Sequence, residues 1–178
     1  MRVIAGAARG RQIKAPKGNE TTRPTTDKVR EAIFGALQFE IPQSRVLDLF
    51  AGSGAMGIEA LSRGADFAVF VDADRGAAAL VRENLKELGM QSQAQVLQMD
   101  YSSALRSLNQ AFDFIFLDPP YHAGLYQPAI EAIIERKLLA PGGKIIAEHE
   151  EDAVFDRRYV QKEKKYGRTR VSFLSIGE

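Results

Sequence analysis

From residue 45 onward the chain alternates short apolar runs with amphipathic stretches, and this rhythm constrains the fold more than any other feature. Such alternation is typical of βαβ units, which build a mostly parallel sheet. The apolar runs predict strands at residues 45–49, 68–72, 94–98, 112–117 and 143–148. Apolar side chains at three- and four-residue spacing predict helices at 55–64, 75–89, 102–108 and 124–138. The pattern therefore predicts an α/β fold with one Rossmann-like sheet.

The two ends of the chain depart from this rhythm. Near the carboxyl end, residues 159–165 and 169–176 are predicted to form a β-hairpin around a Tyr-Gly-Arg turn. At the amino end, residues 1–20 are rich in Gly, Arg and Lys, with a short strand predicted at Val3-Ile4. We expect residues 1–20 to be a basic hairpin arm, too polar to contribute much to a core. The remaining domain is predicted to cover residues 21–178.

A further helix is predicted between this arm and the sheet. The helical run ends near Leu37, and Thr26 or Asp27 is its predicted N-cap. Three glycine-containing positions are predicted to end helices: Gly64, Gly89 and Pro141–Gly143.

Composition excludes several functional classes. The chain has no cysteine, which excludes disulfides, thiolate zinc sites and the thiol nucleophile that C5 methylation of pyrimidines requires. Its two histidines, His122 and His149, lie far apart, so no metal site is expected. No apolar run approaches the roughly 20 residues of a membrane span, and no secretory signal is recognisable. We therefore expect a cytoplasmic protein with no membrane association.

The overall net charge of +1 conceals two basic regions. Eight basic residues lie within positions 1–30 against two acidic ones, a local net charge of +6. In a second stretch, residues 157–170, seven basic residues accompany Glu163. Such regions suit nucleic-acid phosphates, although a solvated surface is the alternative for each. The residues predicted to bind RNA are those of the first region: Arg2, Arg9, Arg11, Lys14, Lys17, Arg23, Lys28 and Arg30.

A glycine-rich turn follows the first predicted strand. Gly52, Gly54 and Gly57 satisfy the GxGxxG pattern at a strand-to-helix junction, where backbone N–H groups and tight turns accommodate nucleotide cofactors. Asp48 favours S-adenosylmethionine (SAM) over NAD, because a carboxylate repels a pyrophosphate but suits a sulfonium and an ammonium group. NAD remains the alternative.

Two more acidic residues follow the next two strands. Asp72 is predicted to accept hydrogen bonds from ribose hydroxyls, and Asp100 from the adenine amino group; strand-end capping is the alternative for both. The predicted cofactor-binding residues are Asp48, Phe50, Ala51, Gly52, Ser53, Gly54, Asp72, Ala73, Asp100 and Tyr101.

The fourth predicted strand runs into the sequence Asp118-Pro119-Pro120-Tyr121, the predicted catalytic site. An exocyclic amine of a base is a poor nucleophile, so acceptors must hold it. Asp118 and the Pro119 carbonyl are the predicted acceptors, and the prolines stiffen the loop. Tyr121 offers a ring on which a flipped-out base stacks. A rigid turn with a packed tyrosine is the alternative reading.

With these motifs, the chain resembles the RsmD family of bacterial 16S rRNA guanine-N2 methyltransferases. The resemblance also rests on the Arg2–Gly6 opening, on Gly10-Arg11 and on the segment Arg23–Phe34. It implies a class I SAM-dependent methyltransferase sheet of seven strands, one of them antiparallel, and SAM as cofactor. It also implies that the partner is 16S rRNA or an assembling small ribosomal subunit; we expect a monomer. Relatives carry Phe for Tyr121 or Glu for Asp72, and Asp100 has no dependable counterpart.

Several alternatives stay open. Adenine-N6 DNA methyltransferases share the Asp-Pro-Pro-Tyr motif, and a protein amino group or NAD-dependent oxidation are further candidates. Guanine is favoured because its N1–H and N2–H donors match the two oxygens of Asp118. RNA is favoured because core elements fill the 63 residues between Gly54 and Asp118, which leaves no room for a DNA-recognition domain. Arg23 has two readings, as a ligand of RNA phosphate or of the SAM carboxylate.

Overall fold

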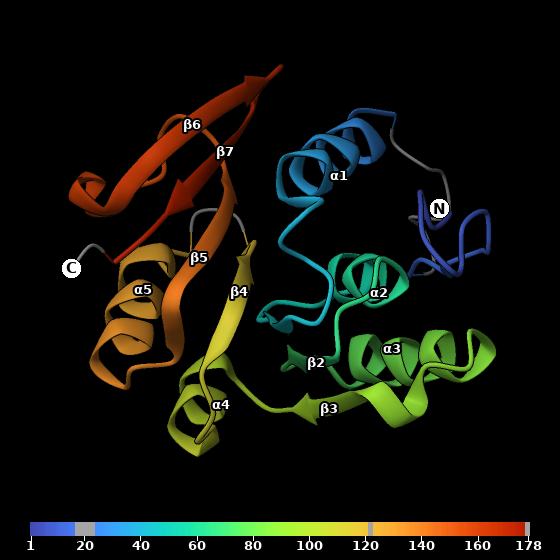
Figure 1. Ribbon diagram of the computed structural model, residues 1–178. Helices are drawn as coiled ribbons and strands as arrows, with labels where there is room; N and C mark the ends of the chain where they lie inside the picture. Colours follow the sequence, from blue (N-terminus) through green and yellow to red (C-terminus); the bar gives the residue numbers. More distant parts are fainter. Residues whose placement is uncertain (17–23, 121–122, 177–178) are drawn as a thin grey trace.

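A computed structural model describes residues 1–16, 24–120 and 123–176, and within them the chain forms one seven-stranded sheet (Figure 1). Its strands are β1 (Arg45–Asp48), β2 (Phe67–Asp72), β3 (Ala94–Gln98), β4 (Phe112–Leu117), β5 (Leu139–His149), β6 (Val160–Tyr166) and β7 (Thr169–Leu174). They are arranged in the order β3-β2-β1-β4-β5-β7-β6. Strand β7 pairs antiparallel with both β5 and β6, while β1 to β5 pair in parallel. The predicted single antiparallel strand is confirmed.

Helices cover both faces of the sheet (Figure 1). The helices are α1 (Pro24–Leu37), α2 (Ala55–Ser62), α3 (Arg75–Glu87), α4 (Tyr101–Ser107) and α5 (Tyr126–Glu135), with short 3-10 turns at Gln91–Gln93 and Arg157–Tyr159. Apolar residues of α1, α2 and α3 form one buried cluster with Phe114 and Phe116 of β4. Those of α4 and α5 form a second cluster with Ile115 and Leu117. Successive strand residues point to opposite faces, so β4 supplies both clusters.

The sheet order places a switch point between β1 and β4. The chain leaves β1 toward β2 and β3 on one side, then returns to β4 on the other side of β1. In open α/β sheets, the loops after two such strands diverge and leave a crevice at the carboxyl edge. The glycine turn after β1 and the Asp-Pro-Pro segment after β4 therefore border the same crevice.

Most predicted boundaries agree with the structure within two or three residues, and β3 and β4 have the predicted bounds. Two predictions are wrong. Helix α1 begins at Pro24, so Thr26 and Asp27 lie in its first turn and do not cap it. Proline is tolerated there because the N–H groups of a first turn have no acceptor within the helix, so the N–H that proline lacks costs no hydrogen bond. Pro141–Gly143 lies inside β5, beside a register shift against β4, and does not end a helix.

The basic arm is built into the core. Its hairpin is closed by hydrogen bonds from Val3 N to Arg11 O (2.9 Å) and from Gly10 N to Val3 O (2.8 Å). Val3, Ala8 and Ile13 are buried in the cluster that α1, α2 and α3 share. The expectation that this segment is too polar to contribute much to a core is therefore wrong, because apolar residues that lie between its basic ones are buried.

Polar contacts fasten the same arm to two helices. The Glu59 carboxylate of α2 accepts hydrogen bonds from the Ile4 and Ala5 N–H groups (2.9 and 3.1 Å). Gly6, at φ +89°, approaches α2 so closely that a Cβ atom would lie 1.9 Å from the Ser62 carbonyl oxygen. Asn84 of α3 exchanges hydrogen bonds with the Lys14 backbone and also donates to the Ser53 carbonyl (2.9 Å). Asn84 thus joins the arm to the glycine turn.

Candidate active site

The glycine turn is shaped by Asp48 at the end of β1. The Asp48 side chain is buried, and its Oδ2 accepts a hydrogen bond from Gly57 N (3.1 Å) in the first turn of α2. The pKa of Asp48 is raised to about 7, chiefly by burial; the Gly57 N–H opposes this rise, and the Asp72 and Glu148 carboxylates contribute to it. Gly54 holds the junction in the left-handed region at φ 85°. Asp48 is therefore poised to ionise when a cation arrives.

Asp72 closes β2 beside the same turn. Its two carboxylate oxygens accept hydrogen bonds from Gly52 N and Asp74 N, both at 2.9 Å. Asp72 lines a cavity of about 660 Å³ together with Phe50, Ala73, Asp100 and Tyr101. The rings of Phe50 and Tyr101 lie 5.7 Å apart within this group. The structure thus brings together the predicted residues for a nucleoside, with lone pairs left on Asp72 for further donors.

The structure gives Asp100 a capping role, which is part of the alternative interpretation. Its side chain accepts a hydrogen bond from Ser103 N (3.1 Å) and caps α4. Hydrogen bonds from the side chain and backbone of Ser103 lower the pKa of Asp100. Its contact with an adenine remains a prediction.

Asp118 lies where two cavities meet. It lines the 660 Å³ cavity and also a second one of about 280 Å³, which Asp48 and Glu148 border as well. Asp118 and Pro120 are exposed, while Pro119 between them is buried. Tyr121 lies outside the described residues, and its stacking role stays a prediction.

Glu148 of β5 is a site residue that the sequence reasoning missed. Leu117 pairs with Ala147 in register, so Asp118 and Glu148 follow at the same edge of neighbouring parallel strands. Desolvation of its carboxyl group is the largest of the effects that raise the pKa of Asp118 well above its usual value, and the charge and hydrogen bond of Glu148 contribute. The ionisation of Asp118 is therefore coupled to the neighbouring carboxyl group of Glu148. Glu148 lies one residue before the end of β5, close to the position that Asp48 and Asp72 have in β1 and β2, and that recurrence was the available signal.

Tyr126 supports this pair from the start of α5. Its hydroxyl donates a hydrogen bond to the Glu148 carbonyl oxygen (2.7 Å). Burial raises the pKa of Tyr126, and the charges of Asp118 and Glu148 contribute. Tyr126 stays protonated and holds the end of β5 in place.

Most of the predicted RNA-binding residues that the structure describes are exposed, but several also donate hydrogen bonds within the protein. Arg2 donates to the Gly10 carbonyl (2.8 Å), Arg11 to the Glu87 carbonyl (2.9 Å), and Lys14 pairs with Glu83 and Glu87. Arg30 is 2% exposed, so its assignment to a phosphate-binding surface is corrected. Arg2, Arg9, Arg11 and Lys28 are exposed, while Lys17 and Arg23 lie outside the described residues.

The strand order, the glycine turn after β1 and the acidic strand ends define the class I methyltransferase fold. The Thermus thermophilus 16S rRNA N2 G1207 methyltransferase, solved with AdoMet and guanosine, shares this fold. It has a TM-score of 0.72 and 23% identity over 90% of this chain and 45% of that one. The Escherichia coli protein yhhF has a TM-score of 0.86 and 33% identity, with 97% and 96% of the two chains covered.

The family is also shown at the level of sequence. The model of conserved hypothetical protein 95 matches residues 1–175, and the chain belongs to this family, the RsmD family. A Haemophilus influenzae protein named ribosomal RNA small subunit methyltransferase D is 41% identical over 155 residues, which cover 85% of this chain and 80% of that protein. The resemblance stated from the motifs is confirmed.

Two further findings concern the part of the chain that the structure describes. No helix there is long and apolar enough to cross a membrane. Within the same residues, no group of three or more His, Cys, Asp or Glu side chains is placed to hold a metal ion.

Proposed function

We propose that this protein transfers a methyl group from SAM to the exocyclic N2 amino group of a guanine in small-subunit rRNA. The position of Asp118 carries the proposal, because its carboxyl group lies at the junction of the two cavities beside the glycine turn. Family membership and the relative's printed name support methylation of rRNA. The choice of guanine N2 rests on the chemistry of Asp118.

The residues present fit SAM. The 660 Å³ cavity, with the Phe50 and Tyr101 rings and the free lone pairs of Asp72, suits an adenosine. The 280 Å³ cavity holds the carboxyl groups of Asp48, Asp118 and Glu148, which suit a cationic methionine end. The same three acids oppose the pyrophosphate of NAD, which disfavours the oxidoreductase alternative. When bound, SAM supplies a methyl group made electrophilic by a positively charged sulfur.

Asp118 and Glu148 have complementary roles in this mechanism. A guanine edge presents N1–H and N2–H donors, and the carboxylate of Asp118 accepts hydrogen bonds from such a pair. Positive charge develops on the amine nitrogen as it attacks, and Asp118 stabilises that charge. The two carboxyl groups then take up the proton that the methylated nitrogen releases, and pass it to solvent. The Pro119-Pro120 segment holds Asp118 in place, so the acceptor is preorganised.

The test uses methyl-labelled SAM with three separate substrate pools: small ribosomal subunits and 16S rRNA from cells lacking the gene, genomic DNA, and total protein. We expect label in the RNA pools only, recovered as N2-methylguanosine after nuclease digestion and mass spectrometry. Label in adenine of DNA, or in protein, would overturn the proposal. Comparing naked rRNA with assembled subunits identifies the partner, and light scattering tests the expected monomer. Fractionation of cells tests the expected cytoplasmic location.

A further inference from the structure

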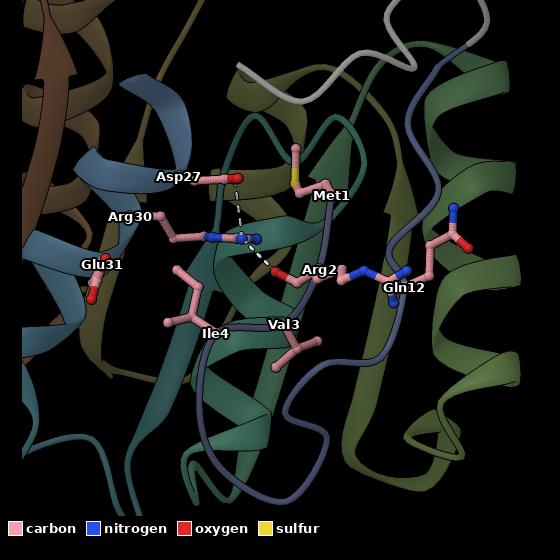
Figure 2. Close-up of a pocket in the computed structure, with 8 residues that line it drawn as sticks. All are labelled: Met1, Arg2, Val3, Ile4, Gln12, Asp27, Arg30 and Glu31. Atoms are coloured by element: carbon pink, nitrogen blue, oxygen red, sulfur yellow. Dashed lines mark hydrogen bonds and ion pairs between the residues drawn. The ribbon is translucent and has the colours of Figure 1, made fainter. Parts of the chain in front are cut away.

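Arg30 of α1 is a buried cation with two unused donors. Its side chain is 3% exposed. Nη2 donates to the Arg2 carbonyl oxygen (2.5 Å) and lies 3.4 Å from the Asp27 carboxylate, as Figure 2 shows. Nε and Nη1 are buried without a hydrogen-bond partner among the described residues. A buried donor on a charged group rarely lacks a partner, because its desolvation is then uncompensated.

The nearest buried acid does not meet this need. The Arg30 Nε lies 4.0 Å from Glu59 Oε1, beyond hydrogen-bond distance. Both oxygens of Glu59 already accept hydrogen bonds, from the Ile4 and Ala5 N–H groups and from Arg63 Nε (2.9 Å). Burial therefore lowers the pKa of Arg30 against the opposing effect of Glu59. The guanidinium is arranged for an anion that the described residues do not supply.

The position of Arg30 indicates which anion this is. Arg30 is the one basic side chain among the described residues that line the 280 Å³ cavity, where it accompanies Asp48, Asp118 and Glu148. The methionine end of SAM carries a sulfonium, an ammonium and a carboxylate. Three acids suit the two cations but repel the carboxylate, so the cavity needs one cation for it. A free N–H group of a guanidinium forms a strong, charge-assisted hydrogen bond to a carboxylate oxygen.

We propose that Arg30 binds the carboxylate of the methionine end of SAM through the guanidinium N–H groups that have no partner among the described residues. This inference rests on the proposed function, since it requires SAM in the cavity. The arm takes part, because the Arg2 carbonyl accepts a hydrogen bond from Nη2 and so fixes the orientation of the guanidinium.

An RNA phosphate is the rival anion. Arg30 also lines a surface hollow of about 500 Å³ (Figure 2), where Arg2 and Gln12 are accompanied by the acids Asp27 and Glu31. These two acids disfavour a phosphate in the hollow, whereas the cofactor carboxylate needs a cation in the 280 Å³ cavity. The cofactor is therefore the better match.

Calorimetry with SAM and decarboxylated SAM tests the proposal, because the two ligands differ only in the carboxylate. We expect Arg30→Met to weaken SAM by at least about tenfold and to leave decarboxylated SAM unchanged or tighter. Arg63→Met is the matched control: Arg63 also pairs with Glu59 and lies over the Phe34 ring (5.2 Å), but it is not among the residues lining the cavity. The control should retain the wild-type difference between the two ligands.

Should Arg30→Met fail to fold, the wild-type protein gives a second readout. The ¹⁵N resonance of the Arg30 Nε–H should shift with S-adenosylhomocysteine and stay in place with 5′-methylthioadenosine, which lacks the amino-acid part. Equal loss of both calorimetry ligands, an unmoved resonance, or loss of rRNA binding with unchanged SAM affinity would each overturn the inference. If the wild-type protein binds no SAM, the proposed function fails as well; if it binds SAM without the discrimination, only this inference fails.

Discussion

The carboxyl edge of the sheet and the amino-terminal arm both carry concentrated charge, but they use it differently. At the edge, Asp48, Asp118 and Glu148 face a cavity. In the arm, Arg11 and Lys14 are engaged by the backbone and side chains of α3. The comparison teaches that the charge of a segment does not reveal whether that charge is available to a ligand. Partners from other elements decide it.

The burial of apolar side chains separates the two regions further. Val3 and Ile13 of the arm are 2% and 0% exposed, so the arm contributes to the core that supports the edge. Asn84 links the arm to the glycine turn, so the arm acts on the site through structure.

The largest expected effect is that of deleting residues 1–13. Burial of Val3 and of Ile13 contributes about 1.5–3 kcal/mol each, and Glu59, which loses two N–H donors but keeps Arg63, adds a cost of about 1–3 kcal/mol. Against a total stability of about 5–15 kcal/mol, we expect most of the folded population to be lost in urea and thermal melts. The control is Arg9→Ala, which changes an exposed arm residue and should melt like wild type. A truncated protein that melts cooperatively near the wild-type temperature would make the arm an appendage.

Next in size is the effect of Asp118→Ala at the edge. We expect turnover to fall at least about 100-fold with little change in SAM affinity, because Asp118 acts on the amine. Asp113→Asn is the control on the same strand: Asp113 accepts a hydrogen bond from Arg45 N (2.8 Å) at the far end of β4. Near-normal turnover in Asp118→Ala would remove its catalytic assignment.

For Asp48, we expect SAM affinity to change by about tenfold per pH unit below its pKa. Its pKa of about 7 means that it is protonated in acid, so SAM affinity should rise as pH increases toward 7 and level off above. Asp48→Asn should bind SAM weakly and without this dependence. The sign for stability is opposite: the folded pKa lies above the unfolded value of 3.8, so stability is lost as pH rises from about 4 to about 7. Calorimetry at several pH values, with melts alongside, checks both trends.

A smaller effect is expected at the missed residue. Glu148→Gln removes a charge that raises the pKa of Asp118, so the acid limb of the kcat/KM profile should move to lower pH. Turnover at the optimum should fall by less than about tenfold, since the amide keeps a hydrogen bond to Asp118. In the control Tyr126→Phe, which removes the hydrogen bond to the Glu148 carbonyl, the acid limb should keep its position. An unmoved limb in Glu148→Gln would uncouple the two carboxyl groups.

The smallest effect concerns RNA phosphates. Strand β6 exposes Lys162, Lys164 and Lys165, whereas Arg2, Arg11 and Lys14 of the arm form hydrogen bonds within the protein. Replacing the three lysines by Ala should reduce the slope of log K against log salt by about 2 to 3, and replacing Arg2, Arg11 and Lys14 by less than about 1. Filter binding over a salt series measures both. The reverse order would return the RNA surface to the arm.

The sequence by itself determined the architecture and the outline of the site. Hydrophobic periodicity and turn residues act over a few neighbours, so β3, β4, the glycine turn and the Asp-Pro-Pro segment could be predicted from local pattern. The acids at the strand ends could be predicted to meet because parallel strands present their carboxyl ends at one edge.

Only the tertiary structure decided which charges are free. Ile4 and Lys14 meet partners on α2 and α3 that lie 55 and 70 positions away, and the pairing of Asp118 with Glu148 depends on the register of β4 with β5. Burial and hydrogen-bond partnership belong to such distant pairs and leave no local pattern. For that reason the sequence predicted that the arm is a basic appendage and that Arg30 is a surface cation, whereas the structure packs the arm against the core and buries Arg30.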